Sequence, residues 1–140
     1  MSKILILLTM IFMHIIADYN MQGWLASAKQ KEWWEKNAPD KFYENDYVIA
    51  LFMHSFSWTF MVMSIPSVYK MLNTPLDRID LVPLFILIIF AINLIVHMVT
   101  DNSKANLKEI NLVQDQLIHL LQILTTWLAM VDYRVVFVIQ

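Results

Sequence analysis

The sequence predicts an all-α fold: a four-helix transmembrane bundle with an interfacial amphipathic segment between its first and second helices. Three observations predict this fold. Of the 140 residues, 59% are hydrophobic and only 16% are charged, whereas soluble domains are about half apolar and about a quarter charged. The chain also has a single glycine and no cysteine. Finally, four stretches have the roughly 20 mostly apolar residues that a helix needs to cross a hydrocarbon core about 30 Å thick.

The four predicted spans belong to a single integral membrane domain that covers residues 1–140. They lie at about residues 4–24, 47–71, 81–101 and 112–132. Because the second and third connections are short, successive spans are expected to be antiparallel neighbours. The first connection, residues 25–46, combines lysine and glutamate with Trp33 and Trp34, and is predicted to lie in the headgroup layer with a break near Pro39. A solvated loop is the alternative for this segment.

The charges of the chain bear on its partners and its orientation. The formal net charge is −2 and the basic residues form no run, so nucleic-acid binding is not expected. Membrane lipids are the expected partners, and a homo-oligomer is left open. The first and third connections carry Lys29, Lys31, Lys36, Lys41, Lys104 and Lys108, and the opposite side carries Lys3, Lys70, Arg78 and Arg134. This distribution favours a cytoplasmic position for the first and third connections.

Ionisable side chains inside the predicted spans carry the functional signal. They include all four histidines, His14, His54, His97 and His119, together with Asp18, Asp101 and Asp115. A charge at mid-bilayer costs about 2.5–3.5 kcal/mol even on insertion scales, so such placement indicates a function. Each span has one histidine, and in three spans a histidine and an aspartate are four residues apart and therefore share a helix face.

The heights of these residues predict that they meet. Counted along the helices, Asp18 and the last three histidines lie roughly 6–10 Å below the surface that carries the first and third connections. Imidazoles and carboxylates without cysteine suit Zn²⁺ first and Mn²⁺ or Fe²⁺ after it. The expected metal ligands are His14, Asp18, His97, Asp101 and His119. The alternative is a metal-free polar network or a proton relay.

Other polar groups are expected to support the chemistry. His54 and Asp115 are predicted to be catalytic proton-transfer groups or further ligands, and Lys104 is predicted to hold a phosphate or carboxylate. Asn93 and Gln122 are expected to orient the ligands. Since the candidate ligands outnumber the needs of one tetrahedral ion, a two-metal centre is left open.

The motifs resemble those of one known family. The pattern consists of His14-x3-Asp18-x3-Gln22, an isolated His54, His97-x3-Asp101-x2-Lys104 and Asp115-Gln116-x2-His119. Over about residues 4–127 it resembles the small membrane proteins of domain-of-unknown-function family 3307, which occur in bacteria and their phages and are similar to inner-membrane metal-dependent hydrolases. The resemblance implies a buried metal centre in a bacterial inner membrane, and it names no substrate. The polar Asn20 departs from the family pattern, which usually continues apolar there.

Together these features predict an integral membrane metal-binding protein. The expected activity is metal-dependent hydrolysis of a lipid-like or interface-presented ester or phosphoester, in which a metal-bound water attacks the substrate. Whether the protein is an enzyme is left open at this stage. The alternatives are a non-enzymatic membrane protein that uses the His/Asp layer as an ion or proton site, and a small phage or host membrane adaptor.

Overall fold

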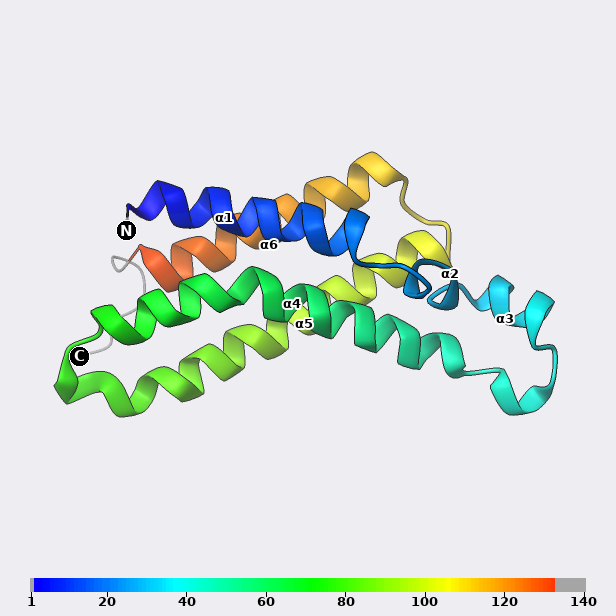
Figure 1. Cartoon of the computed structure of the whole chain (residues 1–140), viewed down its shortest axis with the longest axis horizontal. Helices are drawn as coiled ribbons and strands as arrows, with labels where there is room; N and C mark the ends of the chain where they lie inside the picture. Colours follow the sequence, from blue (N-terminus) through cyan, green and yellow to red (C-terminus); the bar gives the residue numbers. More distant parts are fainter. Residues whose placement is uncertain (1, 133–140) are drawn as a thin grey trace.

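Four long helices form the body of the molecule and run antiparallel to their neighbours (Figure 1). They are α1 (Lys3–Ile15), α4 (Asp46–Asn73), α5 (Val82–Ala105) and α6 (Leu112–Val131). The structure is a computed structural model that describes residues 2–132, without the side chains of residues 77 and 78, so Arg134 lies outside it. The described range is mostly helical and contains no strand. The predicted all-α class is therefore confirmed.

Three helical stretches of the described range are long and apolar enough to cross a membrane: Lys3–Asn20, Lys41–Asn73 and Ile79–Ala105. The sequence predicted four. Helix α6 has the length of a span, with 20 residues, but its glutamines, Asp115 and His119 make it less apolar. Several of these polar side chains, among them Asp115, His119 and Gln122, are buried inside the bundle. Length and composition therefore support three spans, and α6 is a helix of similar length whose polar face is covered by its neighbours.

Helix α5 is polar on its inner side and apolar on its outer side. Its buried residues include Asn93, His97 and Asp101, whereas Leu87 and Ile95 on its outer side are 62% and 61% exposed. A soluble bundle buries its apolar stripe and exposes its polar side. The reversed arrangement is what a helix needs when lipid surrounds it and a polar site lies inside.

The first span ends earlier than predicted. Helix α1 continues into η1 (Ile16–Asn20), a π-helical turn in which the Met21 N–H donates to the Ile16 carbonyl at 2.9 Å. Gly23 then has φ +49°, a left-handed conformation that glycine adopts without steric penalty. The chain therefore leaves the helix direction after Asn20, before residue 24. Asp18 lies within the π-helical turn.

The connection between the first two long helices is built from short helices. These are α2 (Leu25–Ala28), α3 (Lys31–Asn37) and η2 (Lys41–Tyr43), and the break after α3 contains Pro39, as predicted. The Asn106 side chain at the end of α5 accepts from the Lys31 N–H at 2.7 Å and donates to the Lys29 carbonyl at 3.1 Å. These bonds hold α2 beside the end of α5 (Figure 1). Its place in the headgroup layer stays a prediction.

The apolar and polar parts of the interior lie at different heights. Toward the N-terminal end of α1, Ile6 and Met10 pack with Val62 of α4 and Ile123 and Met130 of α6 in one apolar core. Closer to the first and third connections the interior becomes polar.

The third connection ends in a capping box, in which the Asn111 side chain accepts from the Gln114 N–H at 3.0 Å. A second short turn, η3 (Leu76–Leu81), joins α4 to α5.

Candidate metal centre

Buried histidines and aspartates from all four long helical segments converge in two groups that could hold a metal ion. One group consists of Asp18 from η1, His54 from α4 and His97 from α5, and the other consists of His97, Asp101 and His119. In each group the potential ligand atoms lie within 4.8 Å of one another. None of these side chains is more than 6% exposed. Because His97 belongs to both groups, they form one continuous cluster.

His54 lies at the centre of one half of the cluster. Its Nε2 is 3.3 Å from the His97 Nε2, 3.4 Å from the Asp18 Oδ1 and 3.2 Å from the Asp101 Oδ2. Ligands about 2.0–2.2 Å from a tetrahedral ion are themselves about 3.3–3.6 Å apart. The spacing around His54 therefore suits a metal ion. The sequence interpretation placed His54 among the proton-transfer groups or further ligands, and the structure puts it in a ligand group.

Asp101 connects the two halves of the cluster through its two oxygens. While Oδ2 faces His54, Oδ1 lies 3.3 Å from the His119 Nε2, and that nitrogen is also 3.3 Å from the Asp115 Oδ1. Asp115, predicted as a catalytic group, is therefore next to His119 and 1% exposed. These contacts form a continuous row of buried ligand atoms between α5 and α6, in the order Asp101, His119 and Asp115.

Two lysines face this row from the side of the connections. Lys104, as predicted, lies at the cluster, and its Nζ donates to the Asp115 Oδ2 at 2.7 Å. Lys29 was not predicted, and its Nζ donates to the Asp101 Oδ2 at 2.5 Å with the side chain only 12% exposed. Lys29 follows α2, so its position depends on how the first connection folds back over the bundle. Its place among other lysines in a charged connection gave no signal in the sequence.

His14 lies beside the cluster and outside both ligand groups. The Trp58 Nε1 donates to the His14 Nδ1 at 2.9 Å, so this nitrogen accepts and the proton resides on Nε2, which faces the Gln116 Oε1 at 3.1 Å. Gln116 in turn donates to the Asp115 Oδ2 at 3.0 Å. Both ring nitrogens of His14 are thus engaged by protein groups, which favours an orienting role for this residue.

Trp58 and Gln116 are further site residues that the sequence analysis did not single out. The Trp58 ring also stacks on His97, with ring centroids 4.2 Å apart and an interplanar angle of 19°. Gln116 lies between the Asp18 and Asp115 carboxylates, and its Nε2 is 3.4 Å from the Asp18 Oδ2. Gln116 occurs in the Asp-Gln-x2-His motif, so its sequence position was a usable signal. A tryptophan in an apolar span gave none.

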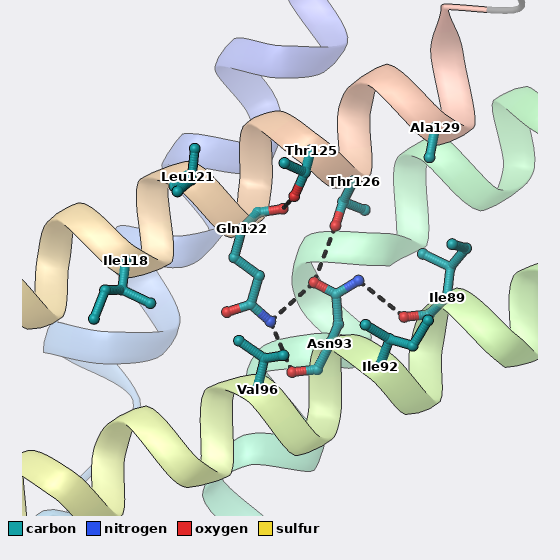
Figure 2. A pocket seen from close by; sticks show the side chains of 10 residues that line it. All are labelled: Ile89, Ile92, Asn93, Val96, Ile118, Leu121, Gln122, Thr125, Thr126 and Ala129. Atoms are coloured by element: carbon teal, nitrogen blue, oxygen red, sulfur yellow. Dashed lines mark hydrogen bonds between the residues drawn. The ribbon is translucent and has the colours of Figure 1, made fainter. Parts of the chain in front are cut away.

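Asn93 and Gln122 form a separate network deeper in the bundle. The Gln122 Nε2 donates to the Asn93 side chain at 3.0 Å and to its carbonyl at 2.7 Å, and Thr126 donates to the same side chain at 3.0 Å. Figure 2 shows these side chains pointing toward each other from α5 and α6. They bond to one another, and within the described chain they form no hydrogen bond to a ligand histidine. Around them lies an apolar groove of about 370 Å³.

The charges of the cluster do not balance when the histidines are neutral. Asp18, Asp101 and Asp115 contribute three negative charges, and Lys29 and Lys104 contribute two positive charges, which leaves a net charge of −1. In the described part of the chain, four buried ligand-type atoms also have no hydrogen-bond partner: Asp18 Oδ1, His97 Nδ1, Asp115 Oδ1 and His119 Nδ1. Buried charges and polar groups of this kind are stabilised by a cation or by a proton.

Comparisons of the chain with protein-family models, with curated proteins and with solved structures found no match. The resemblance to domain-of-unknown-function family 3307 therefore stays a prediction. The function is inferred below from the geometry of the buried cluster.

Proposed function

We propose that the protein is a membrane-embedded, metal-dependent hydrolase of an anionic ester, with a phosphoester as the preferred class. The observation that carries this proposal is the position of the His54 Nε2, which has three potential ligand atoms from three different side chains at 3.2–3.4 Å. We assign Zn²⁺ as the first candidate metal, with Mn²⁺ or Fe²⁺ next, because the ligands are imidazoles and carboxylates.

The bound ion and the residues around the cluster have different roles in the proposed reaction. A bound divalent ion supplies Lewis acidity and a water molecule acidified toward neutral pH. Lys29 and Lys104 supply two ammonium groups at the end of the cluster that faces the connections. Each is paired with a carboxylate that a metal ion would also engage, so metal binding frees the lysines for a phosphate group. Gln116 donates to the carboxylates of Asp115 and Asp18, and His14 donates to the Gln116 side chain.

The groove between α5 and α6 supports a substrate with an acyl chain. Val96 and Ile118, which line it, immediately precede the cluster residues His97 and His119 in sequence. The groove lies deeper in the bundle than the lysines, and half of its lining residues are isoleucine, leucine or valine. An acyl chain in the groove would leave a phosphorylated head near the cluster. This arrangement fits a lipid in which the hydrolysed bond lies at headgroup depth.

We also propose that the protein lies in a membrane with α6 as a fourth spanning helix. We propose a bacterial inner membrane with the first and third connections, and therefore Lys29 and Lys104, on the cytoplasmic side. The distribution of lysines along the sequence supports this orientation. The outward-facing apolar residues of α5 support contact with lipid.

The test compares His54→Gln with His14→Gln, since both replace a buried histidine with the same side chain. Protein from metal-replete cells is purified in detergent, and bound metal is measured by mass spectrometry alongside helicity by circular dichroism and hydrolysis of phosphoester lipids. His54→Gln should lose metal and hydrolysis while retaining helicity, and His14→Gln should retain metal. Folded wild-type protein without metal, or His54→Gln with wild-type metal content, would contradict the proposal.

A proton site is the second candidate, and the charge of the cluster favours it specifically. The net charge of −1 is balanced by a single proton on one of the histidines. Hydrogen bonds also link Trp58, His14, Gln116 and Asp115 in one chain. Metal-free wild-type protein that remains fully helical and exchanges protons with its membrane would support this candidate over the hydrolase.

A further inference from the structure

The row of ligand atoms extends beyond the needs of one ion, and we propose that the cluster binds two divalent ions bridged by Asp101. This inference rests on the proposed metal-binding function and adds the number of ions and the role of each ligand. The starting observation is that the two oxygens of Asp101 face different histidines, His54 on one side and His119 on the other. A carboxylate placed in this way suits two ions about 3.5–4 Å apart.

The first position is enclosed by ligands from three helical segments. It comprises the Asp18 Oδ1, the His54 Nε2, the His97 Nε2 and the Asp101 Oδ2, and the distances from His54 to the other three atoms are 3.2–3.4 Å. The His97 Nε2 is 3.9 Å from the Asp18 Oδ1. Four potential protein ligands surround this position, so a water could join them only in a five-coordinate shell.

The second position lies between α5 and α6. It takes Asp101 and His119 from the second ligand group, whereas the shared His97 is assigned to the first position. Asp115 is added to it because its Oδ1, like the Asp101 Oδ1, lies 3.3 Å from the His119 Nε2. The His119 Nε2 carries at most one proton, so it can donate to only one of these two oxygens. The Asp115 Oδ1 is in fact buried without a hydrogen-bond partner in the described chain. An ion here would engage all three atoms and keep one coordination position open, as catalytic sites do.

The charge count predicts when the second ion binds. One divalent ion changes the net charge of the cluster and its two lysines from −1 to +1, and a second ion raises it to +3. Such a charge is unfavourable in a buried site unless an anion accompanies the ion. Lys104 and Lys29 lie beside the row and can pair with that anion. The second ion should therefore bind more tightly when phosphate is present.

The experiment counts zinc ions per folded chain in detergent, with and without inorganic phosphate. The wild type should bind two ions in phosphate. Asp115→Asn and His119→Gln should each reduce the count to one, because they remove ligands of the second position only. Thr59→Val is the control and should still bind two, because Thr59 is a buried polar residue of α4 whose hydroxyl has no hydrogen-bond partner in the described chain. Circular dichroism establishes that each variant is folded.

The results separate the two-ion inference from the hydrolase proposal. A wild type that binds one ion with and without phosphate overturns the second position and leaves the metal-dependent function standing. Folded wild-type protein that binds no ion overturns both. Two ions in folded His119→Gln overturn the ligand assignment. Should neither variant fold, Mn²⁺-loaded wild type decides by electron paramagnetic resonance, since a spin-coupled pair supports the inference and isolated ions overturn it.

Discussion

Replacing Lys29 with methionine should strengthen metal binding. The Lys29 Nζ lies 2.5 Å from the Asp101 Oδ2, the oxygen that also faces His54. A metal ion on that oxygen and the lysine ammonium compete for the same negative charge. Methionine has a similar length and no charge, so Lys29→Met removes the competitor while filling much of the same space. The unpaired Asp101 carboxylate then stabilises a cation more strongly.

The geometry gives the size of the effect. An ion about 2.0–2.2 Å from the Asp101 Oδ2 would be within about 5 Å of the Lys29 Nζ. With an effective dielectric constant of about 20, a divalent ion and an ammonium group at that distance repel each other by about 7 kcal/mol. Releasing Lys29 from Asp101 instead costs one charge-assisted hydrogen bond, about 1.5–3 kcal/mol. Because releasing Lys29 costs less than the repulsion, the wild type pays only this smaller cost when it binds metal. Lys29→Met removes that cost and should therefore lower the Kd for metal about 10- to 150-fold.

A competition titration against a metallochromic chelator in detergent measures this Kd. Lys31→Met is the matched control, because Lys31 is 46% exposed and pairs only loosely with Glu35 at 3.9 Å. The Kd of Lys31→Met should equal that of the wild type. Hydrolysis by Lys29→Met should fall even though metal binds more tightly, since the freed ammonium is proposed to hold the substrate phosphate. An unchanged or higher Kd in Lys29→Met would refute the competition argument.

Two further predictions concern the orientation and the end of the first span. Single cysteines at Lys31 and at Leu72, which is 79% exposed, should be labelled from opposite sides of the membrane. An impermeant reagent applied to intact cells should label only the Leu72→Cys protein. Labelling of the Lys31→Cys protein alone would mean that the orientation is the reverse. Gly23→Ala should lower the free energy of unfolding by about 1–2 kcal/mol, because Gly23 has φ +49°, a conformation that is strained for alanine. No atom would clash with the added Cβ, so the backbone strain is the whole expected effect. Gly23→Asn should recover part of that loss, as measured by thermal unfolding in detergent, and an unchanged Gly23→Ala midpoint would contradict the strain argument.

Much of the site was predictable because helical geometry fixes it. The four-residue spacing of His97 and Asp101 puts both on one side of α5, and the structure places both in the same ligand group. Counting residues along each predicted span also put Asp18, His54 and His119 near the same height, and the structure brings them together. Both arguments depend on the pitch and rise of a helix, which do not vary with the neighbours of a residue.

The sequence also predicted the class of fold and the break at Pro39, and length and composition support three of the four spans that it predicted. A count of apolar residues treats α6 as a span, but its polar residues keep it out of the stretches that are apolar enough to cross a membrane. Hydropathy reports the average over all sides of a helix. The side that Asp115, His119 and Gln122 occupy is buried, and only the packed structure shows this.

The division of roles among the site residues required the tertiary structure. The sequence pairs His14 with Asp18 and leaves His54 isolated in its span. In the structure, however, His14 is engaged by Trp58 and Gln116 while His54 faces Asp18, His97 and Asp101. Lys29 reaches the cluster because Asn106 holds the first connection over the end of α5. The sequence by itself determined which side chains share a helix face and a height. The rotation of each helix about its axis and the path of the connection were decided by contacts between segments far apart in the chain, because side-chain packing and hydrogen bonds between them select one arrangement among many with the same local geometry.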